Sequence, residues 1–410
     1  MTATASLAHA PASRVLRDLL PIMVVVLAAY LVVGIAMPVL PLYVSHELGF
    51  GTVVVGISVS SAFAAALFSR FWAGRYADTR GTKRSMVIGL IMGMGSGLFY
   101  LASLALVSTP HAAVTVLFLG RALLGGAESF IITGALGWGL ALAGPQNTGK
   151  VIAWVGTALW AAFAVGAPAG TALYTRYGFA AIALTTALLP LVALLLVSRL
   201  TAPRPAKRAT SARKALRQML GAVLWPGVSL ALTAAGFASI TTFGSLLFVD
   251  HGWNSAWLMF TALSVAFMAG RMALGHLPDR LGGARVAVVS IIVEALGLAI
   301  IWLAPSPGLV HVGAAVTGLG YALVYPALGI EVVHRASSEN YGLAVGAFTS
   351  FFDLAMGIAG PALGLVAHYF GFGAVFLVSS LVVLLAAGVA AGLLRQAGSG
   401  HVAAQVQTQS

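Results

Sequence analysis

The sequence contains no cysteine and few charged residues. Without cysteine it can form no disulfide, no Cys-ligated zinc or iron–sulfur site and no catalytic thiolate. Only 8% of the 410 residues are Asp, Glu, Lys or Arg, against about 25% in typical soluble domains. A chain of this length would otherwise be expected to form about two or three soluble domains. The charged residues are too few to cover the surfaces of such domains. A water-soluble protein is therefore excluded.

Hydrophobic residues make up 60% of the chain, and they are grouped in long runs. A helix rises about 1.5 Å per residue, so about 20 apolar residues are needed to cross about 30 Å of hydrocarbon. Such runs must be helical, because lipid offers backbone groups no other hydrogen-bond partner. The sequence therefore predicts an all-α integral membrane protein with twelve spans, at about 19–43, 52–74, 84–106, 113–142, 149–175, 178–199, 218–249, 255–277, 284–305, 309–333, 341–370 and 372–395.

The first span has one alternative interpretation, a cleaved signal peptide, because Arg14 and Arg17 precede it. Its length and the eleven spans that follow favour a membrane helix. If the N-terminus is cytoplasmic, only Arg121, within a span, and Arg176, in an outer loop, fall outside the cytoplasmic segments. This asymmetry predicts that both termini lie in the cytoplasm, for a multi-pass protein of the bacterial inner membrane. It also explains the net charge of +12 without nucleic acid as a partner.

A basic stretch from Arg199 to Arg217, without any acidic residue, separates six spans from six. The segment Arg70-Phe-Trp-Ala-Gly74-Arg-Tyr-Ala-Asp78-Thr-Arg-Gly81 recurs as Arg271-Met-Ala-Leu-Gly275-His-Leu-Pro-Asp279-Arg-Leu-Gly282, with each shared residue displaced by 201 positions. Gly166-Ala-Pro168-Ala-Gly170 is echoed by Gly360-Pro361-Ala-Leu-Gly364. Both copies of the longer repeat are predicted to lie in the loop after the second helix of each half. Such repeats indicate a duplication. The predicted organisation is a tail at 1–18, a six-helix bundle at 19–199, a linker at 200–217, a second bundle at 218–395 and a disordered tail at 396–410.

Two six-helix repeats are typical of secondary transporters, whose substrate site lies at mid-membrane between the halves. The segment from Gly74 to Arg84 resembles the signature loop of the major facilitator superfamily, Gly-x-Leu-Ala-Asp-Arg-x-Gly-Arg-Lys, with Tyr76 in place of Leu and Thr79 and Thr82 in place of Arg. From about residue 20 to 395 the chain is similar to the YhhS-type, or arabinose-efflux-like, bacterial permeases. The stretches that carry this likeness are Gly74-Arg-Tyr-Ala-Asp, Phe118-Leu-Gly-Arg121, Tyr325-Pro-Ala-Leu-Gly and Asp353-Leu-Ala-Met-Gly-Ile-Ala-Gly-Pro361.

The resemblance implies that the signature loop is a gate. Asp78 would hold the outward-open state by meeting a basic residue or helix end of another span, and Asp279 would do the same in the second half. Glycines permit close helix approach and tight turns, and basic side chains can anchor to anionic headgroups. A solvated loop is the alternative. The predicted gating residues are Gly74, Asp78, Gly81, Lys83, Arg84, Gly275, Asp279 and Gly282.

Charged residues near span centres cost at least about 2.5 kcal/mol each and are functional by default. Arg121 and Glu128 lie seven positions apart, on one helix face, where they can flank a ligand or serve only interhelical hydrogen bonds. Arg121 with Gly125 resembles the superfamily's Arg-x-x-x-Gly element, which is linked to proton transfer. Asp353 and Glu294 have no basic residue within one turn, and desolvation disfavours the charged form of a carboxylate. We therefore expect Asp353, with Glu294 or Glu128, to carry a proton. For Glu294, a hydrogen bond to a neighbouring helix is an equal alternative.

The resemblance implies a substrate cavity lined by the first, fourth, seventh and tenth helices. Aromatic and Met side chains beside one or two charges suit an amphipathic organic solute, although such aromatics often serve packing instead. The candidates are Tyr30, Met37, Arg121, Glu128, Phe237, Thr241, Tyr321 and Tyr325.

The predicted function is a proton-coupled exporter, an antiporter of a drug, sugar or metabolite that works by alternating access. Proton-coupled uptake and a non-transporting sensor or scaffold are the alternatives. The Gly166–Gly170 stretch resembles the antiporter motif Gly-Pro-x-x-Gly-Gly, and helix packing explains it equally well. We see no nucleophile–base pair, metal cluster or phosphate-binding loop, so we expect no enzyme activity, metal or cofactor. The expected partners are a small-molecule substrate, protons and membrane lipid, and we expect a monomer.

Overall fold

The computed structural model describes residues 12–201, 216–335 and 341–407, and within these ranges the regular elements are all helices. Eleven of the described helices are long and apolar enough to cross a membrane. The last of these segments, Ala344–Arg395, is 52 residues long, more than twice the length that one crossing needs. A non-helical residue, Gly371 (φ 81°, ψ 170°), divides it into two crossings. The all-α membrane fold predicted from the sequence is confirmed.

The helices form two sets. The first set consists of α1 (Ala12–Ala36), α2 (Leu40–Leu42), α3 (Thr52–Arg80), α4 (Thr82–Ala105), α5 (Pro110–Ala143), α6 (Thr148–Tyr177) and α7 (Phe179–Arg199). A π-helical turn, Tyr43–Glu47, extends α2, and a 3-10 turn, Pro145–Asn147, precedes α6. The second set consists of α8 (Leu216–Asp250), α9 (Ala256–Leu274), α10 (Leu277–Leu281), α11 (Gly283–Leu303), α12 (Pro307–Arg335) and α13 (Tyr341–Gln407).

Both ends of the described chain are more helical than predicted. Helix α1 begins at Ala12, inside the segment predicted as a tail, and α13 continues to Gln407. The prediction of disorder at 396–410 is therefore wrong up to Gln407. No proline interrupts this segment, and its Ala and Gln residues favour a helix. Most of the predicted linker, residues 202–215, lies outside the described residues.

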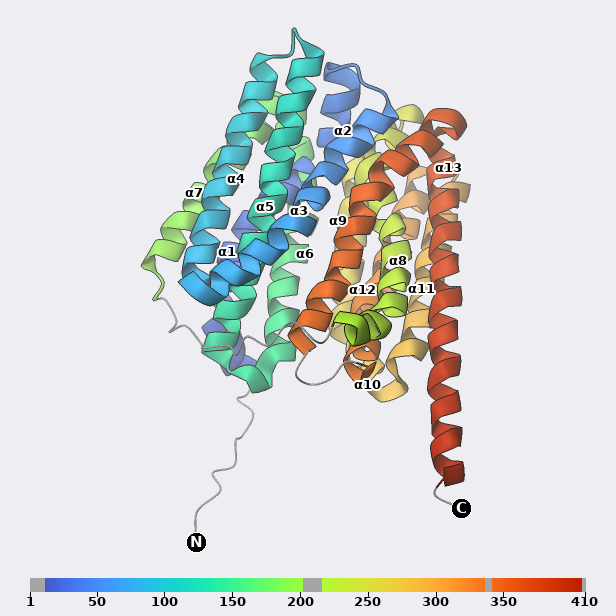
Figure 1. Ribbon diagram of the computed structural model, residues 1–410. Helices are drawn as coiled ribbons and strands as arrows, with labels where there is room; N and C mark the ends of the chain where they lie inside the picture. Colours follow the sequence, from blue (N-terminus) through green and yellow to red (C-terminus); the bar gives the residue numbers. More distant parts are fainter. Residues whose placement is uncertain (1–11, 202–215, 336–340, 408–410) are drawn as a thin grey trace.

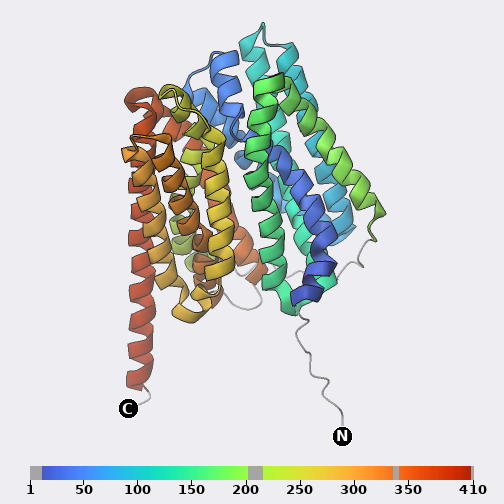
Figure 2. The same cartoon turned by 180° about the vertical axis from the view of Figure 1, so that it is seen from behind.

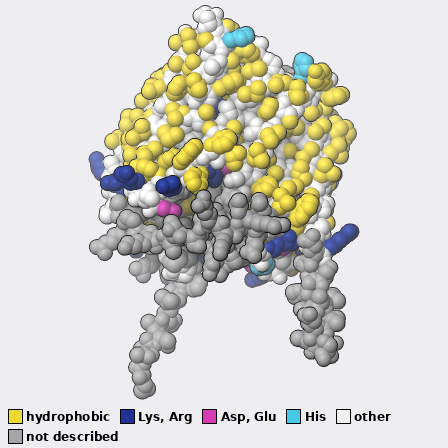
Figure 3. Space-filling model, viewed as in Figure 1, with side chains coloured by type: hydrophobic (Ala, Val, Ile, Leu, Met, Phe, Trp, Pro, Cys, Tyr) yellow, Lys and Arg dark blue, Asp and Glu magenta, His cyan; other side chains and the backbone are white. Residues whose placement is uncertain are grey.

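The two sets stand side by side (Figures 1 and 2). Across their boundary α3 packs on α13, and α6 packs on α9. In Figure 2 the two halves meet near the end that carries α2 and separate toward the end where the chain begins and finishes. Figure 3 shows a broad hydrophobic band with Lys and Arg along its border near the chain ends, and His at the opposite end. This arrangement places the contact between the halves on one side of the hydrophobic band.

The repeat has a clear backbone role at its last glycine. Gly81 (φ 98°) lies between α3 and α4, and Gly282 (φ 90°) lies between α10 and α11. Only glycine adopts such positive φ values without a steric penalty, so both copies need glycine to turn the chain. The rest of the first copy is not a loop, because α3 remains helical to Arg80. Arg70 and Arg271 therefore lie inside helices. The prediction from the sequence, which placed both copies of the repeat in cytoplasmic loops, is wrong for these two residues.

Candidate functional site

The two halves are joined by an antiparallel contact between α3 and the first crossing of α13. The Thr52 hydroxyl donates to the Gly364 carbonyl at 2.7 Å, and the Ser60 hydroxyl donates to the Met356 carbonyl at 2.6 Å. Between them the backbones touch so closely that a Cβ on Gly360 would collide with Ser60. Small residues allow this approach. We call this region, from Thr52 to Ser60 on α3 and from Met356 to Gly364 on α13, the joined end.

An ion pair lies next to the joined end, toward the middle of the molecule. Arg70 Nε donates to Asp353 Oδ2 at 2.7 Å, and Arg70 Nη2 donates to Asp353 Oδ1 at 2.9 Å. Bidentate pairs of this kind are among the strong hydrogen bonds of proteins. The Asp353 side chain is 2% exposed and that of Arg70 is 28% exposed. Within the described ranges, it is the only ion pair that links the two halves.

Glu128 on α5 faces this ion pair without joining it. Its side chain is half-buried, and its carboxylate makes no hydrogen bond or ion pair with any described residue. It lies within electrostatic range of Arg121, Asp353 and Arg70. The Tyr30 hydroxyl approaches its backbone carbonyl at 3.4 Å. The structure thus brings Tyr30, Glu128 and Asp353 together, and adds Arg70.

Arg121 is buried, and it holds α5 against α3. Its Nε donates to the Ser58 carbonyl at 3.2 Å and its Nη2 donates to the Val59 carbonyl at 3.1 Å. One turn later Gly125 meets the Ala62 carbonyl with no room for a Cβ. The Arg-x-x-x-Gly spacing therefore serves a close, hydrogen-bonded helix crossing. This contact corresponds to the interhelical alternative considered for Arg121.

Glu294 on α11 is fully buried, and neither carboxylate oxygen has a hydrogen-bond partner among the described residues. It faces Gly236 on α8, where a Cβ would lie 2.5 Å from Glu294 Oε1. The hydrogen bond considered as an alternative is therefore not present, and the side chain points into the second bundle. A buried polar group without a partner is costly, so this position calls for a functional explanation or a test.

Replacing Glu294 by methionine tests whether the carboxyl group is only a structural burden. We expect the free energy of unfolding to rise by about 1–3 kcal/mol, because an unpartnered polar group is removed at similar volume. Thermal unfolding in detergent measures the change, and transport is measured in parallel with and without a pH gradient. A stabilised variant that no longer couples transport to protons would assign the carboxyl group a role in coupling. Lower stability would contradict the unpartnered environment.

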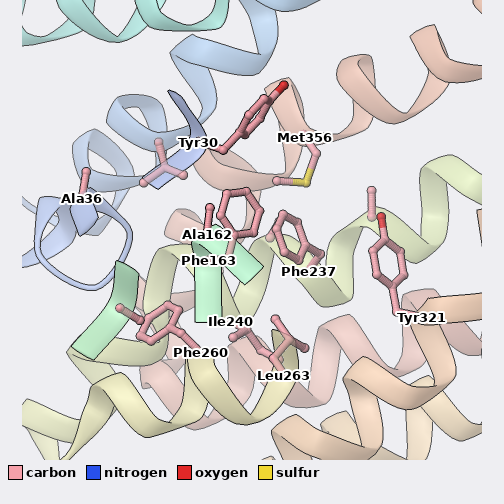
Figure 4. Packing of buried hydrophobic residues seen from close by; sticks show 14 of the residues in the cluster. Tyr30, Ala36, Ala162, Phe163, Phe237, Ile240, Phe260, Leu263, Tyr321 and Met356 are labelled. Carbon is pink, nitrogen blue, oxygen red and sulfur yellow. The ribbon is translucent and has the colours of Figure 1, made fainter. Parts of the chain in front are cut away.

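Aromatic side chains from both halves meet around Trp160 on α6. Its ring stacks on Phe267 of α9 at a centroid distance of 3.7 Å and meets Phe237 of α8 edge-on at 5.7 Å. Phe237 in turn stacks on Tyr321 at 5.9 Å. Figure 4 shows Phe163 and Phe237 packed between Tyr30 and Tyr321. These rings form an apolar surface that crosses the boundary between the halves.

The remaining cavity candidates have other surroundings. The Tyr325 hydroxyl hydrogen-bonds with Thr349 Oγ1 at 2.7 Å, and its ring lies within electrostatic range of Arg70 and Asp353. The Thr241 hydroxyl donates to the Phe237 carbonyl of its own helix at 2.8 Å. Met37 follows the end of α1 and packs against the core near α2. Tyr325 therefore lies with the charged group, and the cavity role of Thr241 and Met37 stays a prediction.

The predicted gate is disengaged in this structure. Asp78 and Asp279 are exposed, and neither forms an ion pair with another described residue. Gly74 has open space where a Cβ would stand, so the close approach expected there is absent. Gly275 meets only the Arg271 carbonyl just before it. This loop lies at the far end of α3 from the joined end, and its role as a gate stays a prediction.

The two basic residues of the loop differ. Lys83 Nζ donates to the Ser198 carbonyl at 3.1 Å and to the Leu200 carbonyl at 2.5 Å, whereas Arg84 is exposed. Lys83 thus caps α7, contrary to the headgroup anchor we expected. The last carbonyls of a helix lack partners and attract cations, which explains the contact.

Four residues of this region were not predicted as site residues: Arg70, Trp160, Phe267 and Arg271. The sequence held one signal for the arginines. They occupy equivalent positions of the repeat, and both fall within predicted spans, at 52–74 and 255–277. No pattern in the sequence distinguished Trp160 from the other tryptophans.

Comparisons with known proteins agree with this architecture. The sequence profile of the Major Facilitator Superfamily matches residues 22–282 and 255–407. The chain belongs to this superfamily. An uncharacterized MFS-type transporter of Salmonella typhimurium is 42% identical over 367 residues, covering 90% of this chain and 94% of the relative. Another from Pseudomonas aeruginosa is 38% identical over 368 residues, covering 90% of each chain.

The fold of this superfamily member is also found in the nucleoside transporter NupG. Its crystal structure matches with a TM-score of 0.69 at 17% identity, covering 92% of this chain and 99% of the other. The protein is thus a membrane transporter of the MFS type. In such transporters the substrate passes between the two halves. The Arg70–Asp353 pair, Glu128 and the aromatic rings around Trp160 all lie at that boundary.

Proposed function

We propose that this transporter is a proton-coupled exporter of small organic molecules, and that Asp353 carries the proton. The observation that supports this most directly is the bidentate Arg70–Asp353 pair between the halves. The pair needs an ionised carboxylate, because a proton on Asp353 removes both its charge and an acceptor position for Arg70. Proton binding therefore breaks a link between α3 and α13, and proton release restores it.

The same chemistry gives an order of events. With the joined end in contact and Asp353 ionised, the protein has released its proton and receives substrate at the opposite end. Movement of the substrate-loaded protein separates α3 from α13 and exposes Asp353 to protons on the other side. Protonation then accompanies substrate release. Glu128 is half-buried, and its carboxylate lacks a partner among the described residues. We propose that Glu128 is a second group that binds the proton and that Glu294 is a third.

We propose that the joined end faces the outside of the bacterial inner membrane and that both termini are cytoplasmic. The Lys and Arg side chains near the chain ends in Figure 3 support this orientation, because basic residues are enriched on the cytoplasmic side. In this orientation the structure is closed toward the outside. The exposed Asp78 then belongs to an open cytoplasmic gate.

The test uses purified protein in liposomes that contain a pH-sensitive dye, with a panel of amphipathic cations, sugars and organic anions. We expect substrate-evoked proton flux with wild type and no such flux with Asp353→Asn, because asparagine cannot take up a proton. Substrate binding should remain measurable in the variant. Asp250→Asn, an exposed acid at the end of α8, is the matched control and should behave as wild type. Undiminished proton coupling in Asp353→Asn would reject the assignment, and flux without any proton movement would reject coupling itself.

A further inference from the structure

Arg271 is the repeat counterpart of Arg70, yet no carboxylate pairs with it. It lies on α9, and its side chain is half-buried. Its Nη1 donates to the Ala322 carbonyl at 3.3 Å, and Ala322 is near the middle of α12. The guanidinium therefore reaches the central depth of the molecule. Its remaining N–H donors have no hydrogen-bond partner among the described residues.

The charges around the boundary between the halves do not cancel. Arg70 is paired with Asp353, and Glu128 lies within electrostatic range of Arg121. For Arg271 the only titratable group in range among the described residues is the neutral Tyr325. The repeat supplies no acid here, since Leu159 stands where the Gly-Pro echo would place a counterpart of Asp353. A cation at this depth without a counterion is costly and is functional by default.

The surroundings of Arg271 combine this charge with an aromatic surface. Phe267 precedes it by one turn on the same face of α9, and Phe267 stacks on Trp160 of the other half. Tyr321, next to the carbonyl that Arg271 contacts, lies 6.0 Å from Phe267 between ring centroids. An unpaired guanidinium therefore borders a set of rings shared by both halves.

We propose that Arg271 binds the anionic group of the substrate, and that the substrate is an amphipathic organic anion, with a carboxylate, sulfonate or phosphate beside an aromatic or apolar body. Guanidinium groups bind such oxyanions through parallel N–H donors, and the rings around Trp160 receive the apolar body. An organic cation is less well served next to Arg271, because the guanidinium repels it and the charge of Asp353 is already paired with Arg70. This inference rests on the proposed transport function and names its substrate class.

The test measures equilibrium binding to the full-length protein in detergent, without a pH gradient. The probes are naphthalenesulfonate and naphthylmethylammonium, which share a ring system and carry opposite charges. We expect saturable binding of the sulfonate to wild type, binding weakened by about tenfold or more in Arg271→Gln, and a smaller loss in Arg271→Lys, which keeps the charge but not the bidentate geometry. Arg285→Gln, an exposed arginine of the same half, is the matched control and should bind as wild type.

Three results would overturn the proposal: equal binding of the sulfonate by wild type and Arg271→Gln, preference for the ammonium probe, or no saturable binding of the sulfonate. If Arg271→Gln does not fold, the proposal is still tested by Arg271→Lys and by the comparison of the two probes on wild type. Failure of proton coupling is a separate outcome, because this binding needs no proton movement. An exporter of cations would thus retain its proton flux while failing here.

Discussion

Replacing Arg70 by glutamine should lower the free energy of unfolding by about 3–5 kcal/mol at neutral pH, the usual effect of removing one partner of a buried ion pair. The reason is that Asp353, 2% exposed, would be left as an unpaired carboxylate that water cannot reach. Replacing Asp353 by asparagine should cost less, because Arg70 is 28% exposed and its charge can still be hydrated. The double variant should recover most of the stability, since neither charge is then left alone.

The pH dependence follows from the same reasoning. As the pH falls, protonation of Asp353 removes the unpaired charge in Arg70→Gln, and in wild type it removes the pair itself. The stability difference between wild type and Arg70→Gln should therefore shrink toward acidic pH. Unfolding curves of the four proteins at two pH values complete a double-mutant cycle. An Arg70→Gln variant as stable as wild type at neutral pH, or a double variant no better than the worse single one, would contradict the pair.

Replacing Gly360 by alanine should shift the protein away from the state in which the joined end is in contact. The new Cβ would collide with the Ser60 hydroxyl and the Gly56 carbonyl, and a backbone atom cannot yield as a flexible side chain does. Overpacking of this kind costs about 1–3 kcal/mol, which corresponds to about 5- to 150-fold in the population of a two-state equilibrium. Transport should fall because each cycle needs the protein to return to the state in which the joined end is in contact, and that state is then less populated.

Labelling measures this shift directly, because the chain has no cysteine of its own. A single cysteine at Thr52, half-buried where α3 meets α13, should react faster with a membrane-impermeant maleimide in the Gly360→Ala background. Gly357→Ala is the matched control on the same helix, since a Cβ there meets Ala64 at 3.7 Å, an ordinary contact. Equal labelling rates in both backgrounds would show that the glycine contact does not hold this end together.

The twelve crossings were predictable because each is a long apolar run, and even the division at Gly371 falls between two predicted spans. An apolar run is a local signal that needs no knowledge of tertiary contacts. The ends of helices were less predictable. The span predicted at 52–74 continues in the structure as helix α3 to Arg80.

The site was predicted in part for the same reason. Asp353 and Glu128 were identified as intramembrane acids from their apolar neighbours alone. The partner of Asp353 lies 283 positions away in the other half, and no spacing rule connects them. Glu294 was identified too, but its lack of a hydrogen bond depends on the packing of α8 against α11. Tertiary contacts, not composition, separate a paired acid from an unpaired one.

Helix α3 also links the two ends of the boundary between the halves. It runs unbroken from Thr52 to Arg80 without a proline, a length of about 43 Å. Arg121 fastens it to α5 near Ser58, and Ser69 fastens it again through the Ser129 hydroxyl at 3.0 Å. Because these ties hold α3 against α5, the two helices are expected to move together as one rigid body. A tilt of this body against the second half then brings one end of α3 closer to that half while the other end moves away.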